Sequence, residues 1–166
     1  MISEQTILLI LLSLIYITLI AHYQIYRIVK LMWSILRIET GNRNLKSRTW
    51  QAKTIGTIDR ILFLLSFLLE TPEFIGLWLG IKTVSQYKRW SDNEPGRATF
   101  NIFLTGNGLS ILYAVAGYGF IYLGKKVEVL LSTDTISIIL ILFGPFILSE
   151  IMYRVLKNDE RDATPD

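Results

Sequence analysis

Hydrophobic residues along the chain form long runs that are separated by short polar segments. The clearest runs cover Thr6–Ile20, Phe100–Leu123 and Thr135–Met152, and a membrane-spanning helix needs about 20 mainly apolar residues. A further apolar stretch, from Asp59 to Lys82, is interrupted by Glu70-Thr71-Pro72-Glu73. The pattern predicts an all-α fold, a polytopic helical membrane bundle of four to five helices with a central helical hairpin broken at Glu70–Glu73.

The polar break in this stretch has the residues of a helix end followed by a helix start. A hydroxyl at Thr71, a proline at Pro72 and a carboxylate at Glu73 favour the first turn of a helix. One helix therefore ends near Glu70 and the next begins at Pro72. We expect a hairpin over residues 54–88 that crosses fully and puts both glutamates at the outer interface; a re-entrant hairpin is the alternative.

The first helix is predicted to continue past its most apolar part. Apolar residues keep a spacing of three and four from Ile25 to Leu36, which is the period of a helix face, and Gly41-Asn42 is a typical helix end. Basic residues on the other face and in the following loop are expected to contact lipid headgroups or a cytosolic protein. They are Arg27, Lys30, Arg37, Arg43, Lys46 and Arg48.

Lysine and arginine favour the cytoplasmic side of a membrane protein, so their distribution predicts topology. None precedes Tyr23, eight lie between Tyr23 and Arg60, four between Lys82 and Arg97, two at Lys125-Lys126, and three from Arg154 onward. A hairpin that enters and returns puts fifteen on one side and two on the other, whereas four alternating spans give ten against seven. We therefore expect an outside N-terminus and an inside C-terminus, in a bacterial cytoplasmic (inner) membrane.

These features describe one integral membrane helical domain over residues 1–157. It comprises a long first helix, a basic inner loop over 27–60, the hairpin over 54–88, and spans over 99–123 and 134–153. Gly144-Pro145 predicts a kink in the last span. The polar residues 158–166 are expected to be a disordered tail.

Small residues recur on one face of the span at 99–123. Gly106, Ser110, Ala114 and Gly117 are spaced by four, four and three, and such faces let helices approach closely in lipid. We interpret them as helix-packing residues, and we expect a homo-oligomer.

Polar side chains inside the membrane segments are candidates for function, because a charge in hydrocarbon costs at least about 2.5–3.5 kcal/mol. For the two glutamates of the break, a turn in outer water is favoured over a carboxylate pair lining an ion or proton path. Asn107 is expected to form an interhelical hydrogen bond. Asp59 and Arg60 are interpreted as a charged interfacial anchor or as an intrahelical and interhelical pair. Glu150 is expected to reach the lipid headgroups or to pair with Arg154, four residues further along the same helix face. The complete candidate set is Glu70, Glu73, Asn107, Glu150, Asp59 and Arg60.

Composition supports this picture and excludes several kinds of site. The chain is 51% hydrophobic and 19% charged, against about 25% charged residues in soluble domains. It has no cysteine and one histidine, which argues against a metal site. No phosphate loop, metal box or nucleophile motif is present, so we expect no enzyme and no cofactor. The net charge of +3 is explained by membrane orientation, and no nucleic acid is expected.

Three segments resemble a family of bacterial membrane proteins of unknown function. Ile55–Leu62 is similar to the family's I-G-x-x-E-R-x-L, Phe74–Thr83 to A-I-G-F-x-x-A-x-K-S, and Phe100–Ser110 to A-E-Y-x-L-I-G-T-L-L-S. The likeness covers residues 55–115, about a third of the chain. Asn101 replaces the family's glutamate, so no role of that glutamate carries over. The resemblance implies a shared membrane module and no mechanism.

The function expected from the sequence is that of a non-enzymatic membrane component. It self-assembles, recruits a cytosolic protein through its basic inner loops, or does both. The alternative is a small oligomeric channel or transport subunit for ions or protons, with Glu70, Glu73 and Asn107 near the path.

Overall fold

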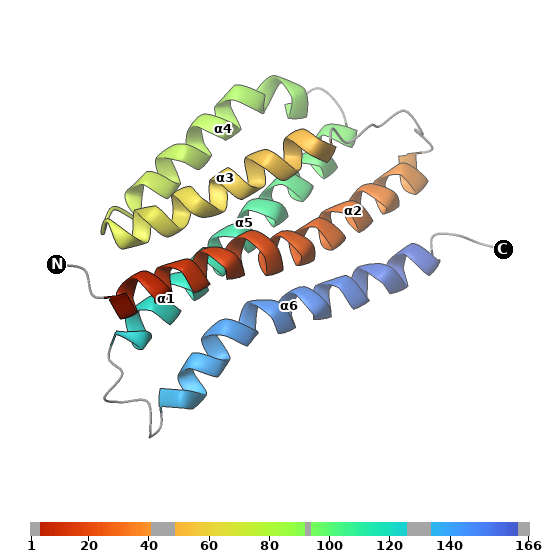
Figure 1. The fold of residues 1–166 in the computed structure, drawn as a ribbon. Coiled ribbons are helices and arrows are strands. Elements are labelled where there is room, and N and C mark those ends of the chain that lie inside the picture. The colour runs from red at the N-terminus through yellow and green to blue at the C-terminus, as the bar shows by residue number, and fades with distance from the viewer. Residues whose placement is uncertain (1–3, 41–48, 92–93, 126–133, 163–166) are drawn as a thin grey trace.

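The structure, a computed structural model, describes residues 4–40, 49–91, 94–125 and 134–162. Helix α1 (Glu4–Ile15), a π-helical turn (Tyr16–Ile20) and α2 (Ala21–Thr40) follow one another without a break. The remaining helices are α3 (Thr49–Leu68), α4 (Glu73–Ser91), α5 (Glu94–Gly124) and α6 (Asp134–Asp162). They lie side by side in an elongated bundle (Figure 1). The predicted all-α bundle with a central hairpin is confirmed.

The helix ends gather at two opposite ends of the bundle (Figure 1). The apex end holds the start of α1, the turn between α3 and α4, the end of α5 and the start of α6. The basic end holds the end of α2, the start of α3, the end of α4, the start of α5 and the end of α6. The two arms of the hairpin therefore run in opposite directions, and the second arm returns to the end of the bundle where the first arm begins.

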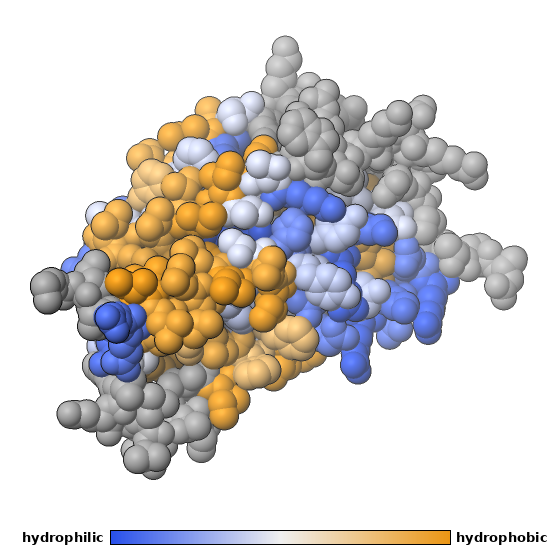
Figure 2. All heavy atoms as spheres, in the orientation of Figure 1, coloured by the Kyte–Doolittle hydropathy of each residue, from blue (hydrophilic) through white to orange (hydrophobic). Residues whose placement is uncertain are grey.

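Three helical segments are long and apolar enough to cross a membrane: Glu4–Leu36, Gly96–Gly124 and Ile139–Arg161. They contain or overlap the three apolar runs of the sequence, which confirms an integral membrane character. Figure 2 shows hydrophobic side chains covering the part of the visible face nearer the apex end, and hydrophilic ones nearer the basic end. The 20 residues of α3 make it about 30 Å long, about the thickness of the hydrocarbon core.

The turn at the hairpin apex has the hydrogen bonds of a Schellman motif. The Thr71 N–H donates to the Ser66 carbonyl over 2.8 Å, and the Glu70 N–H donates to the Phe67 carbonyl over 3.2 Å. Glu70 takes the left-handed position of the motif, with φ 57°, which is usually occupied by glycine. Helix α4 begins at Glu73, one residue after the expected Pro72.

We predict that Glu70→Gly stabilises the protein by about 1 kcal/mol, because glycine adopts a positive φ without the Cβ penalty. Glu70→Ala is the matched control, since alanine keeps the Cβ and should give no such gain. Thermal unfolding in detergent measures both. If alanine stabilises the protein as much as glycine does, the stabilisation comes from removing the charge and not from relieving backbone strain at the positive φ.

The small face of α5 is filled by other helices of the same chain. A Cβ on Gly117 would lie 2.6 Å from Ser13 Oγ of α1, and one on Gly106 would lie 3.5 Å from Val29 Cγ2 of α2. Ala114 packs in a cluster with Phe63 of α3 and Ile75 of α4, and the Ser110 hydroxyl donates to the Gly106 carbonyl. The face is a packing surface as predicted, and the contacts that it makes here are within the chain.

Helix α6 contains Pro145 and changes direction part-way along its length (Figure 1). Proline removes a backbone donor and disturbs the preceding turn. Two tyrosine hydroxyls donate to carbonyls in this region: Tyr16 to Leu142 over 2.5 Å and Tyr113 to Pro145 over 3.3 Å. Neighbouring helices thus donate hydrogen bonds to two backbone carbonyls around the predicted kink.

Two predicted boundaries are wrong. The first helix continues through residue 40 as predicted, but residues 27–40 in α2 and 49–60 in α3 are helical where an inner loop over 27–60 was expected. Residues 41–48 lie outside the described part. Residues 158–162 continue α6 where a disordered tail was expected, because Glu and Arg are good helix formers. The rest of that tail, 163–166, is outside the described residues.

Candidate functional site: a buried ionic cluster

A carboxylate on α3 is buried against the inner face of α4. Asp59 is 3% exposed. Its Oδ2 accepts a hydrogen bond from Lys82 Nζ over 2.5 Å, and its Oδ1 accepts one from Trp78 Nε1 over 2.9 Å. Trp78 and Lys82 are four residues apart and therefore project from one face of α4. Both carboxylate oxygens are thus occupied by donors from the second arm of the hairpin.

Asn107 connects this ion pair to α5. Lys82 Nζ donates to Asn107 Oδ1 over 3.1 Å, and Asn107 Nδ2 donates to the Phe103 carbonyl over 2.8 Å. The interhelical hydrogen bond predicted for Asn107 is confirmed. Asp59, Trp78, Lys82 and Asn107, called the ionic cluster below, join three helices through one ammonium group.

Arg60 is buried on a different side of α3 and does not pair with its neighbour Asp59. Its Nε donates to the Ile17 carbonyl over 2.7 Å, and its Nη2 donates to Thr57 Oγ1 over 3.0 Å and lies 3.3 Å from His22 Nδ1. Ile17 belongs to the π-helical turn, where the extra residue shifts carbonyls out of the regular α-helical pattern. The guanidinium therefore fastens α3 to this irregular turn.

The ionic cluster lies well inside the bundle. Asp59 is eleven residues before Glu70, and Lys82 is nine residues after Glu73. At 1.5 Å per residue, both are about 14–17 Å from the hairpin apex. With the apex at one membrane surface, this is about half of a hydrocarbon core of about 30 Å.

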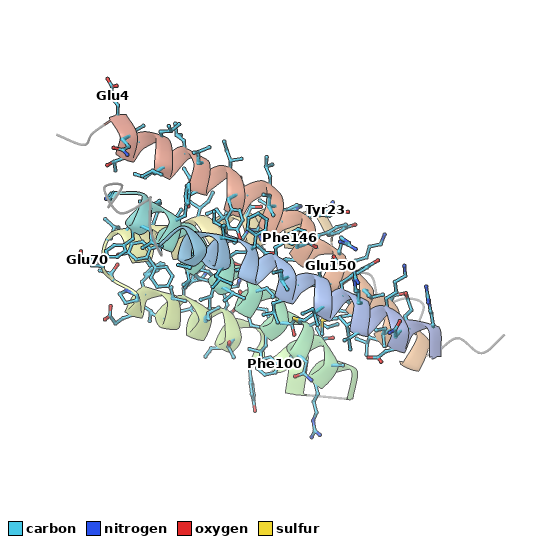
Figure 3. The ribbon with its side chains drawn as sticks, turned by 90° about the horizontal axis from the view of Figure 1, so that it is seen from below. Glu4, Tyr23, Glu70, Phe100, Phe146 and Glu150 are labelled. Carbon is cyan, nitrogen blue, oxygen red and sulfur yellow. The ribbon has the colours of Figure 1, made fainter. Side chains whose placement is uncertain are left out.

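The two glutamates of the break lie elsewhere. Glu70 and Glu73 are exposed at the apex end, where Figure 3 shows Glu70 away from the middle of the bundle. Asn107 contacts the middle of the hairpin instead. The three residues predicted to flank one path are therefore not brought together.

Glu150 forms a second ionic group, between α2 and α6. Its Oε1 is 3.3 Å from Arg154 Nε, the predicted partner, and its Oε2 is 3.2 Å from Arg27 Nη1. The Arg27 guanidinium also lies 3.8 Å from the centre of the Tyr153 ring. Lys30 is exposed on α2, the side chain of Arg37 is outside the described part, and Arg43, Lys46 and Arg48 lie wholly outside it.

Sequence reasoning missed three participants: Lys82, Trp78 and His22. The charge count groups Lys82 with the basic residues up to Arg97, whereas its spacing from Trp78 and its position at the end of the apolar stretch are signals of a place inside the hairpin. Among the described residues, no group of three or more His, Cys, Asp or Glu side chains is placed to hold a metal ion.

Comparison of the chain with protein-family models, curated proteins and solved structures found no match. The resemblance of residues 55–115 to a bacterial membrane family stays a prediction.

Proposed function

We propose that this protein is a non-enzymatic membrane component that recruits a cytosolic protein at its basic end. The observation that carries the proposal is the length of three helical segments. Residues 4–40 extend about 55 Å, α5 about 46 Å and α6 about 43 Å at 1.5 Å per residue, against a hydrocarbon core of about 30 Å. At the apex end, the ends of these three segments lie at a similar level (Figure 1). The length by which they exceed the hydrocarbon core is therefore expected to project beyond the membrane at the basic end.

The proposed orientation puts this projecting part in the cytoplasm of a bacterial cell. The helix ends at the basic end carry most of the lysines and arginines, and such residues favour the inner side. The N-terminus is then outside and the C-terminus inside, and the α3–α4 hairpin crosses the inner membrane fully.

The paired state of the buried charges supports a structural role for them. Each oxygen of Asp59 and the amide oxygen of Asn107 accepts a hydrogen bond from within the chain. Intramembrane polar groups that are paired in this way hold helices together. We assign the ionic cluster the structural role of fixing the hairpin to α5. In this proposal the cluster takes part in no catalysis and binds no metal or cofactor.

Self-assembly is also part of the proposal, through a surface other than the small face of α5. Gly76 and Gly80 lie four residues apart on the exposed side of α4, and a Cβ on either would meet nothing within 4 Å. A second copy in the membrane fits this open pair, as small-xxx-small faces do. The native mass of the protein in detergent measures whether copies associate.

A second candidate function is conduction of protons or small ions. The observation that favours it is the ionic cluster itself, since an acid, a base and an amide lie about half-way along the hairpin, and intramembrane acids often mark such routes. On this alternative Asp59 and Lys82 take the place of the two apex glutamates.

Photo-crosslinking in native membranes tests the leading proposal. A crosslinking amino acid replaces Tyr87 or Asp159, both exposed toward the basic end, or Lys125 at the apex end as the matched control. We expect a discrete protein adduct at the first two positions and none at the third. Adducts at Lys125 alone would contradict the proposal of a protein partner at the basic end. Proton or potassium flux through reconstituted protein that disappears in Asp59→Asn, with assembly intact, would establish conduction instead.

A further inference from the structure

The Arg27–Glu150–Arg154 group is part of a larger basic surface where α2 and α6 run in the same direction. Lys30 follows Arg27 by three residues, and Lys157 follows Arg154 by three, so each lies on the same helix face as its predecessor. We call these four basic side chains, together with Glu150 between them, the α2–α6 seam. They hold four positive charges against one negative charge.

Glu150 holds the two arginines in place, and the exposed Arg154 side chain can present N–H donors to a ligand. Its two oxygens are taken by Arg27 and Arg154, and Gln24 accepts a further hydrogen bond from Arg27 over 3.3 Å. The Arg154 side chain is nevertheless 77% exposed, and a guanidinium has five N–H donors in a fixed fork. Such a fork matches the oxygens of a phosphate group.

Apolar side chains continue from the seam toward the apex end. Tyr23 on α2 is 60% exposed, and Ile147 and Ile151 on α6 are each 53% exposed. Figure 3 shows Tyr23 and Glu150 at a similar level along the bundle. The surface therefore has exposed apolar side chains beside its basic side chains and on the side toward the apex end.

The level of the seam matches that of lipid headgroups. Arg27 is 23 residues after Glu4 and Arg154 is 20 residues after Asp134, which places them about 35 Å and about 30 Å from the apex end. The hydrocarbon core is about 30 Å thick, and the headgroups lie just beyond it. Exposed tyrosine at this level is typical of the membrane interface.

We propose that the α2–α6 seam is a binding site for one anionic phospholipid of the inner leaflet. The phosphate lies between Lys30 and Arg154, where the excess positive charge complements it, and the acyl chains follow Tyr23 and the two isoleucines. This site is independent of the proposed protein partner, since it concerns the lipid-facing side of two helices within the membrane.

Native mass spectrometry of the full-length protein in neutral detergent tests the site. The protein is titrated with dioleoyl phosphatidylglycerol or with dioleoyl phosphatidylcholine, which has the same chains and no net charge. We expect tighter binding of phosphatidylglycerol, reduced about 25-fold in Lys30→Gln with Arg154→Gln, since a basic side chain near an anionic lipid is worth about fivefold. Phosphatidylcholine binding should not change.

Two variants control for folding and for charge in general. Lys30→Arg with Arg154→Lys keeps both charges and should retain most of the preference, and Lys125→Gln at the apex end should retain all of it. Equal binding of the two lipids, or a preference that survives in the glutamine variant, would overturn the site. Displacement of the lipid by millimolar inorganic phosphate would show a free-anion site and overturn it as well.

Discussion

Asp59→Ala should destabilise the protein by about 3–5 kcal/mol, the cost of leaving one charge of a buried pair without its partner. Asp59 accepts from Lys82 and Trp78 in a position that is almost fully buried. Its removal leaves the Lys82 ammonium with the Asn107 amide oxygen as its hydrogen-bond acceptor among the described residues and with the Phe103 ring 5.4 Å away, in surroundings that solvate it poorly. Lys82→Ala should cost a similar amount for the converse reason. Unfolding in detergent with increasing denaturing surfactant measures both.

The double variant Asp59→Leu with Lys82→Met separates pairing from packing. Replacing both members of a buried ion pair by apolar residues is often neutral or stabilising, so this variant should be far more stable than either alanine variant. Glu73→Ala is the matched control, because it removes an exposed carboxylate whose contribution is small. If Asp59→Ala and Lys82→Ala each lose no more stability than Glu73→Ala, water reaches the ionic cluster.

The ionic cluster also shows which part of a membrane site the sequence predicts. That Asn107 needs an interhelical partner follows from its place in an apolar span, and this was confirmed. The identity of the partner did not follow, because it depends on how α4 crosses α5. Glu150 gives the same lesson: its contact with Arg154 follows from a spacing of four, whereas Arg27 comes from a helix 123 residues away.

The π-helical turn at Tyr16–Ile20 is the feature with the weakest sequence signal. Its residues, YITLI, are an ordinary apolar helix sequence, and no glycine or proline marks the turn. The structure puts the Arg60 guanidinium on the Ile17 carbonyl inside it. A buried arginine from another helix therefore accompanies the irregular turn. The charge of Arg60 predicts that it needs a partner inside the bundle, but no sequence feature identifies that partner as the Ile17 carbonyl.

Gly117→Ala should destabilise the protein by about 1–3 kcal/mol, the usual cost of overfilling a packed core. The added Cβ would lie 2.6 Å from Ser13 Oγ and 3.1 Å from Ile17 Cγ2. Both neighbours are fully buried, so neither side chain has open space to move into. Thermal unfolding in detergent measures the loss. Gly108→Ala is the matched control on the same helix, since its Cβ meets nothing within 4 Å, and it should gain up to about 1 kcal/mol in helix propensity.

Ser13→Ala should restore much of the stability lost in Gly117→Ala, because it deletes the atom in closest conflict. The Ser13 hydroxyl oxygen is buried without a hydrogen-bond partner among the described residues, so its removal alone costs little. The two changes should therefore be strongly non-additive, as expected for residues in contact. Additive effects, or a Gly117→Ala variant as stable as Gly108→Ala, would show that α1 and α5 are further apart in lipid than in this structure.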